Sequence, residues 1–339
     1  MNTITIYFNK SRLYRNYYTN GNTFFEYFKE VNEIENINTK LELHNIYRIL
    51  NHNEYICYKY FETFLTSVNK IKYDNLILKF TENKNSADIE ISDLKRQGFT
   101  LENLKNKKKI VFNIEDRTGW SPADVPMPYF TGLYTKINID TKLKFTELLN
   151  KKTYFLSYVG GIFRGPRDNN GTPKRKLTVD IFFKLNKSNT EKYKELFFAP
   201  MIANTHKQEK KLELDWKFRI KAKDIYYDSL FSWQPEGDTP TRRGFYESIL
   251  CGCIPVINKT TFNMYKKLVI GEENVKKIAI ILDDCNFYDG NYVFNYLLSL
   301  NDDKITEYRN NINKIKDRLQ WNIFNKENAF IDVIKKIIK

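Results

Sequence analysis

The sequence has few cysteines, and this shortage excludes several kinds of protein. Only four occur among 339 residues: Cys57, Cys251, Cys253 and Cys285. They are too few and too irregularly spaced for a disulfide scaffold or a zinc site, and Cys251-Gly-Cys253 is not a redox CxxC pair. We therefore expect thiols that are buried and pack as small hydrophobic side chains.

Long apolar runs are lacking as well. The opening stretch, MNTITIYFNKSRLYRNYYTN, has no apolar core of the length that a signal peptide needs. No segment approaches the roughly 18 apolar residues of a membrane span. The sequence therefore predicts a protein without a transmembrane segment and with a cytoplasmic location. It also contains no internal repeat and no low-complexity linker.

Material for a folded core is plentiful, and the charge is one-sided. Hydrophobic residues make up 42% of the chain and aromatic residues 15%, which argues against global disorder. The formal net charge of +14 suggests an anionic partner such as a phosphate, a nucleic acid or an acidic glycan. However, lysines are spread along the whole chain, and most of them are expected simply to solvate its surface.

The first half of the chain is predicted to form an α/β domain, residues 1–150. Residues 3–8 alternate as in a strand, and residues 22–34 repeat their apolar side chains at helical spacing. Three short β-rich runs follow, at 73–82, 87–92 and 107–116.

The second half, residues 151–320, alternates strands and helices more clearly. Strand-like runs occur at 154–160, 253–257 and 276–284, and the run 177–187 fits a helix or a further strand. Such alternation predicts βαβ units around a largely parallel sheet. The tail from residue 302 has the periodicity of two amphipathic helices, and we expect its last part, 321–339, to pack back on the N-terminal domain.

Residues 229–257 have the order of a strand, a loop, a helix and a second strand. Ser229 to Gln234 are expected to form the first strand, which Pro235, Gly237 and Pro240 would end. The helix begins either at Thr239-Pro240 or later, near Thr241 to Gly244. Gly252 suits the left-handed position after the helix, and Ile254 to Ile257 resume as a buried strand.

This arrangement is suited to a phosphate-bearing ligand. In a parallel sheet, ligands bind beyond the carboxyl ends of the strands, where the following helices present free N–H groups. Arg242 and Arg243 lie at that end and could bind a diphosphate. Glu247 could accept hydrogen bonds from the two hydroxyls of a ribose. The alternative is an exposed helix start with a surface glutamate.

A resemblance becomes visible in the same stretch. The run FSWQPEGDTPTRRGFYESILCGCIPVI, from Phe231 to Ile257, resembles the signature of the exostosin family, the family 47 glycosyltransferases. Weaker likenesses occur at 108–120 and at 154–161 with the following TPKRKL. The resemblance implies a GT-B architecture, in which two Rossmann-like domains face each other across a cleft and the C-terminal domain holds a nucleotide sugar, here expected to be a UDP-sugar.

The resemblance also suggests roles for single residues. Glu247 corresponds to the acidic residue at the donor ribose, Arg243 to a phosphate-binding arginine, and Arg175 to the basic residue after the glycine-rich loop. Many members carry a further arginine where this chain has Gly244; Arg242 compensates, or the diphosphate is bound differently. The remaining expected donor-site residues are in the same loop: Gly237, Asp238, Thr239 and Thr241.

The family is inverting, which implies a single displacement with a base for the acceptor hydroxyl. Glu115 or Asp116, after the run IVFNI, is the expected base, with Asp124 a lesser candidate and a solvated turn the alternative. No DxD pair is evident, since Asp283-Asp284 is contiguous, so no metal ion is predicted. The missing membrane anchor, unlike Golgi-resident members, suggests a viral or bacterial setting.

Three other functions remain open at this point. A GDP-fucose-dependent fucosyltransferase has a broadly similar arrangement of an acidic helix and a glycine-proline turn. A catalytically silent glycan-binding protein could use the same fold. A basic nucleic-acid-binding protein would explain the charge, but the chain has no compact arginine-rich tract. We therefore expect a nucleotide sugar and a glycan acceptor as partners, and no nucleic acid.

Overall fold

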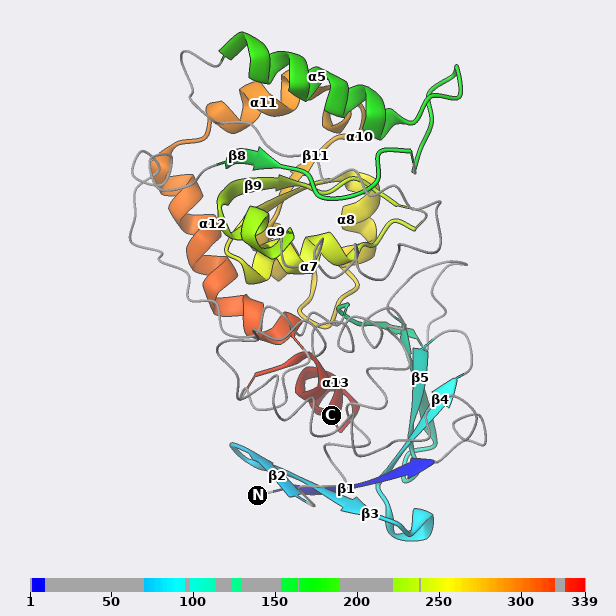
Figure 1. The fold of residues 1–339 in the computed structure, drawn as a ribbon. Helices are drawn as coiled ribbons and strands as arrows, with labels where there is room; N and C mark the ends of the chain where they lie inside the picture. Colours follow the sequence, from blue (N-terminus) through cyan, green and yellow to red (C-terminus); the bar gives the residue numbers. More distant parts are fainter. Residues whose placement is uncertain are drawn as a thin grey trace, which may run out of the picture. The chain divides into compact units, whose positions relative to one another are not determined.

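A computed structural model describes residues 2–9, 70–94, 98–113, 124–129, 154–163, 165–189, 222–237, 239–320 and 327–338. The chain divides into two compact units (Figure 1). Unit 1 comprises Met1–Gly132 with Gln320–Lys339, and unit 2 comprises Leu133–Leu319. The helix expected at 22–34 lies outside the described residues.

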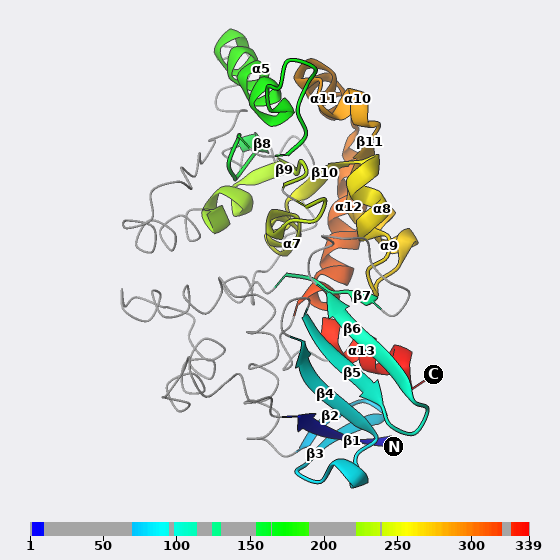
Figure 2. The same cartoon turned by 90° about the vertical axis from the view of Figure 1, so that its right-hand side faces the viewer.

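Unit 1 is built on a seven-stranded sheet with the order β2-β3-β1-β4-β5-β6-β7. The strands are β1 (Asn2–Asn9), β2 (Lys70–Tyr73), β3 (Leu76–Thr81), β4 (Ile89–Leu94), β5 (Gly98–Asn103), β6 (Lys108–Asn113) and β7 (Asp124–Pro126). β1 lies parallel to β3 and β4, and β6 to β7, whereas the β2–β3, β4–β5 and β5–β6 pairs are antiparallel. Figure 2 shows β4, β5 and β6 side by side. The sheet is therefore mixed, and only β3–β1–β4 form a run of three parallel strands.

The last helix of the chain belongs to unit 1. α13 (Ala329–Ile337) is amphipathic, with a buried apolar face. Asn328 caps it by accepting a hydrogen bond from the backbone N of Ile331 at 2.9 Å. The Nδ2 of Asn328 also donates to the Oη of Tyr73 at 3.5 Å, which connects the start of the helix to the end of β2.

Unit 2 has a four-stranded sheet whose strands are all parallel. Its order is β11-β10-β9-β8. The strands are β8 (Tyr154–Ser157), β9 (Ser229–Trp233), β10 (Ile254–Asn258) and β11 (Ile280–Leu282). Every residue of β9 and β10 is buried, as expected for central parallel strands covered on both faces. The α/β class and the parallel sheet predicted from the sequence are confirmed.

Helices cover both faces of this sheet. They are α5 (Lys174–Asn189), a short helix at 222–227, α7 (Arg243–Leu250), α8 (Lys259–Tyr265), α9 (Glu272–Ile278), α10 (Asp284–Phe287), α11 (Gly290–Leu298) and α12 (Asp302–Ile315), with the 3-10 turn η4 (Lys316–Leu319). α5 and α11 lie together on one face, and α7 lies on the other (Figures 1 and 2). The run 177–187 is therefore helical, and α12 and α13 are the two expected amphipathic helices of the tail.

Aromatic packing fixes the carboxyl end of β9. Trp233 is fully buried and stacks on Phe287, with 5.2 Å between ring centroids. Its Nε1 donates to the carbonyl oxygen of Phe287 at 3.2 Å. Tyr158 and Phe182 contact the indole edge-on. These contacts hold the end of β9, which leads into the loop before α7, in place.

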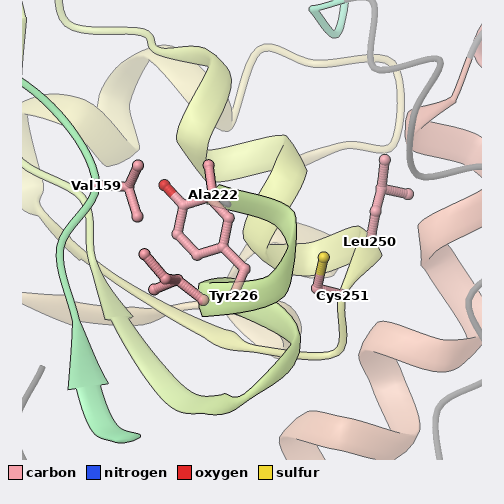
Figure 3. Close-up of a cluster of buried hydrophobic side chains, with 6 residues drawn as sticks. Val159, Ala222, Tyr226, Leu250 and Cys251 are labelled. Carbon is pink, nitrogen blue, oxygen red and sulfur yellow. The ribbon is translucent and has the colours of Figure 1, made fainter. Parts of the chain in front are cut away.

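A second cluster lies beside α7. Val159, Ala222, Tyr226, Leu250 and Cys251 gather there, and Figure 3 shows how they come from the β8 loop, the 222–227 helix and the end of α7. Cys251 and Cys253 are buried as expected, whereas Cys285 is exposed. The prediction was wrong for Cys285 because this residue lies in the first turn of the short surface helix α10.

Candidate donor site

The loops that follow the four strands of unit 2 meet at one edge of the sheet, which we name the carboxyl edge. In Figure 1 the arrowhead of β8 points toward the loop that leads into α5. α7 follows β9 after a loop of nine residues, α8 starts directly after β10, and α10 follows β11 after one residue. Helix starts of this kind present unpaired N–H groups to a ligand.

The β9–α7 loop is built by its proline and glycine residues. The N–H of Gly237 donates to the carbonyl of Thr239 at 2.9 Å, and the hydroxyl of Thr239 donates to the carbonyl of Thr241 at 3.0 Å. Arg242 has extended backbone angles and is the N-cap residue, so that α7 begins at Arg243. Of the two expected helix starts, the later one is therefore correct, and the left-handed Gly252 (φ 74) after the helix is confirmed.

Arg242 connects the β9–α7 loop to the loop after β8. Its Nη2 donates to the carbonyl of Val159 at 2.7 Å and its Nη1 to the carbonyl of Pro235 at 3.1 Å. The guanidinium also lies over the ring of Tyr158, 5.3 Å from the centroid. A charged donor thus binds neutral backbone acceptors in both loops.

Arg175, in the first turn of α5, makes a second connection between the same loops. Its Nη1 donates to the carbonyl of Gly161 at 2.8 Å, and its Nη2 to those of Pro235, at 3.3 Å, and Glu236. Its side chain is buried. We call Arg175 and Arg242, with the four carbonyls that they bind, the arginine clasp. In this structure the clasp holds the two loops in a fixed relative position at the carboxyl edge.

Two glycines permit this close packing. At Gly165 the φ angle is +85°, and a Cβ atom would lie 2.8 Å from the carbonyl oxygen of Glu236. At Gly244 a Cβ atom would lie 2.6 Å from the Oη of Tyr226 and 2.7 Å from the Oε1 of Gln234. The first turn of α7 therefore packs directly on these two side chains, which gives a physical reason for glycine at this position.

The expected ribose and phosphate residues lie on α7. Arg243 is its first residue and is partly exposed, while Glu247 is largely buried, with 6% of its surface accessible. Four residues apart, they share one face of the helix. Thr241 is buried in the preceding loop.

The other expected site residues are not all open to inspection. Asp238, Glu115 and Asp116 lie outside the described residues. Asp124 is the first residue of β7, where it pairs with Val111 in the ladder. The structure thus brings Arg175, Arg242 and Gly237 together at the carboxyl edge with the start of α7.

The ends of β10 and β11 add polar groups that the sequence did not single out. Asn258, fully buried, caps α8 by accepting from the N–H of Thr261 at 2.9 Å, and its Nδ2 donates to the Oε1 of Glu236 at 2.8 Å. A polar residue at the end of an otherwise apolar, buried parallel strand was the signal that could have identified Asn258.

Asp283 and Asp284, which follow β11, bind groups of the protein. Asp283 forms an ion pair with Lys259, which raises the pKa of that lysine. Asp284 accepts from the hydroxyl of Thr260 at 2.8 Å and from its N–H at 3.2 Å. Within the described residues, no group of three or more His, Cys, Asp or Glu side chains is arranged to hold a metal ion.

Comparison with known proteins decides the family. The sequence model of the Exostosin GT47 domain matches residues 86–291, more than half of the chain. The chain belongs to the exostosin GT47 family. The resemblance inferred from residues 231–257 is thereby confirmed, and the matched region includes the whole arginine clasp and the carboxyl edge of the GT47 sheet in unit 2.

Several plant relatives support this assignment. The chain is 34% identical over 108 residues to Probable xyloglucan galactosyltransferase GT13 of Arabidopsis thaliana. The matched stretch covers 28% of this chain and 21% of that protein. It is 25% identical over 158 residues to Xyloglucan-specific galacturonosyltransferase 1 of the same plant, and this match covers 46% of this chain and 20% of that protein. The GT47 chain thus spans about a fifth of the length of these relatives. In the described part of the chain, no helix has both the length and the apolar character needed to cross a bilayer.

Proposed function

We propose that this chain is an inverting glycosyltransferase that moves a sugar from a nucleotide sugar, a UDP-sugar, to a hydroxyl group of a glycan acceptor. The observation that carries the proposal is the carboxyl edge of unit 2, where two clasped loops and the start of α7 converge within the GT47 region. The name of one plant relative, a galactosyltransferase, supports transfer of a neutral hexose, whereas that of another, a galacturonosyltransferase, supports transfer of a uronic acid.

Donor binding would use the face of α7 and the loop before it. We propose that Glu247 accepts hydrogen bonds from the ribose hydroxyls and that Arg243 and the free N–H groups of α7 bind the diphosphate. Because the guanidinium groups of Arg175 and Arg242 already bind carbonyls, their contribution would be to fix the loops and to add positive potential. Gly237, Asp238, Thr239, Thr241 and Gly244 would shape the backbone around the phosphates.

The reaction would be a single displacement. The acceptor oxygen forms a bond to the anomeric carbon while the bond from that carbon to the diphosphate oxygen breaks, and a carboxylate takes the hydroxyl proton. We propose Glu115 or Asp116 as this base, with Asp124 as the lesser candidate. These residues belong to an N-terminal domain (1–150) that we propose faces the donor domain (151–320) across a GT-B cleft. Arg243 and the helix N–H groups would stabilise the charge of the leaving group, so we expect activity that does not depend on a divalent ion.

The test combines binding and transfer. Isothermal titration of the full chain with UDP, GDP and CMP, with and without manganese, should show selective binding of UDP that is indifferent to the metal. Mass spectrometry of mixtures of UDP-sugars and oligosaccharide acceptors should then show an added sugar and free UDP. Selective binding of GDP would indicate a GDP-sugar enzyme instead. Nucleotide binding without transfer to any acceptor would indicate a catalytically silent protein, and no nucleotide binding would refute the proposal.

A further inference from the structure

Glu236 has a carboxylate that the proposed donor chemistry has not used. It follows the buried strand β9 at the carboxyl edge and is partly exposed. Its backbone is fixed, because Arg175 binds the carbonyl of Glu236 and both arginines of the clasp bind that of Pro235. A side chain at this position therefore leaves the main chain from a defined point.

The carboxylate itself is also oriented. Its Oε1 accepts from the Nδ2 of Asn258 at 2.8 Å. Asn258 is fully buried, and its Oδ1 is held by the N–H of Thr261 at the start of α8. The amide that positions Glu236 thus has its own orientation set by a helix cap, and this partner is neutral rather than cationic.

Tyr288 packs edge-on against Trp233, the last residue of β9, and adds a polar group near this end of the strand. The hydroxyl of Tyr288 is buried, and it has no hydrogen-bond partner among the residues that the structure describes. Burial raises the pKa of Tyr288, and the negative charge of Glu236 adds to this effect. Lys174 lies over the Tyr288 ring, 5.5 Å from its centroid.

We infer that Glu236 selects the sugar of the donor by accepting hydrogen bonds from hydroxyl groups of a neutral hexose or pentose. An ionised carboxylate only accepts hydrogen bonds, so it suits hydroxyl donors and repels a second carboxylate. A uronic acid would therefore be disfavoured at this position. The inference rests on the proposed nucleotide-sugar site and names the class of sugar that the site takes.

The experiment measures the affinities of the full chain for free UDP and for a series of UDP-sugars by isothermal titration. The series contains UDP-galactose, UDP-glucose, UDP-xylose, UDP-glucuronic acid and UDP-galacturonic acid. The variant Glu236→Gln keeps the size of the side chain and removes its charge. Glu273→Gln, an exposed residue of α9 paired with Lys276, is the matched control.

We expect wild-type protein to bind a neutral sugar donor more tightly than either uronic acid donor. Glu236→Gln should lower the affinity for the best neutral donor by about tenfold, because a hydrogen bond to a charged group is lost. The affinity for UDP should be unchanged. Deoxy analogues of that donor, each lacking one hydroxyl of the sugar, locate the contact. Wild type and Glu236→Gln should bind one of these analogues with equal affinity, because it lacks the hydroxyl that Glu236 binds. Glu273→Gln should match wild type throughout.

Other results would overturn the inference. The first is that wild-type protein binds a uronic acid donor most tightly, and the second is that Glu236→Gln binds the neutral donor with unchanged affinity. The third is that Glu236→Gln loses affinity equally for UDP and for the UDP-sugar, which would assign Glu236 to the nucleotide or to the loop structure. Failure of wild-type protein to bind UDP at all would instead refute the proposed function, and the titration with free UDP separates that case from the others.

Discussion

The two sheets of this chain differ in how they direct their strands. In unit 2 all neighbouring strands are parallel, so the loops after β8, β9, β10 and β11 reach the same edge. In unit 1 three of the six neighbouring pairs are antiparallel, and the turns at Asp74 and Lys107 return the chain toward the opposite edge. A parallel sheet therefore concentrates loops and helix starts, and Arg175, Arg242, Glu236 and Asn258 gather at that edge.

The two units also differ in what their buried or partly buried charged groups bind. In unit 1 the buried Glu90 pairs with Lys84 at 2.6 Å, one charged side chain with another. In unit 2, Arg175 and Arg242 bind backbone carbonyls of two loops. The first arrangement joins β4 to the turn before it, whereas the second positions a loop that precedes a helix start. Changes in the two units should therefore have separable effects on stability and on ligand binding.

The largest effect is expected for Arg175→Ala. The change removes the donor of three loop carbonyls and should lower the free energy of unfolding by about 3 kcal/mol, while donor binding falls below detection. Urea unfolding and titration with UDP measure the two effects. Lys176→Ala, which removes an exposed ion pair with Asp180, is the control and should cost less than about 1 kcal/mol. A stable Arg175→Ala variant with normal UDP binding would contradict the role of the clasp.

Gly165→Ala should have the next largest effect. The left-handed backbone and the approach to the carbonyl of Glu236 together should cost about 2 to 3 kcal/mol. Gly171→Ala is a close control, because its φ is +76° but no atom lies within 4 Å of the added Cβ. It should cost only about 1 kcal/mol from the backbone strain. Equal losses in urea unfolding for the two variants would show that the contact with Glu236 contributes nothing.

A smaller effect on stability but a clear effect on binding is expected for Glu247→Gln. If the carboxylate binds the ribose, the dissociation constant for UDP should rise about tenfold, since a hydrogen bond to a charged group is lost. The same variant should bind 2′,3′-dideoxy-UDP as weakly as wild-type protein does. A rise for both ligands alike would place Glu247 in the structure of α7 and not at the ribose.

The smallest effect concerns unit 1 and should leave donor binding unchanged. Burial raises the pKa of Tyr73 to about 12. Because the folded pKa lies above the unfolded value near 10, the neutral phenol stabilises the fold below pH 10, and this contribution is lost as the pH rises toward 12. Tyr73→Phe should therefore show a shallower loss of stability than wild type between pH 10 and 11.5 in urea unfolding. Parallel curves would contradict the pKa shift.

Much of unit 2 could be predicted from its sequence because local signals agree there. Pro235, Gly237 and Pro240 end a buried strand, and Gly252 ends a helix, so the β9–α7–β10 order followed from residue types. The run 177–187 stayed ambiguous because its β-branched and aromatic residues suit either structure. The antiparallel strand β5 was missed because QGFTLEN has only a weak alternation between apolar and polar residues.

The site was less predictable than the fold. An arginine that binds a phosphate and one that binds backbone carbonyls offer the same donors, so the sequence could not distinguish the clasp from a phosphate site. Likewise, Glu236 and Asn258 are 22 residues apart and meet only because β9 and β10 are neighbours in the sheet. Contacts that depend on strand order leave no local pattern.

The central claim is that the carboxyl edge of unit 2 binds a nucleotide sugar. Hydrogen–deuterium exchange of the full chain, with and without saturating UDP, tests it most directly because it reports every backbone N–H at once. We predict slower exchange in the UDP-bound chain at the β9–α7 loop and the first turn of α7, and unchanged exchange in β2 to β6 of unit 1. Protection confined to unit 1, or UDP binding without protection at the start of α7, would contradict the account.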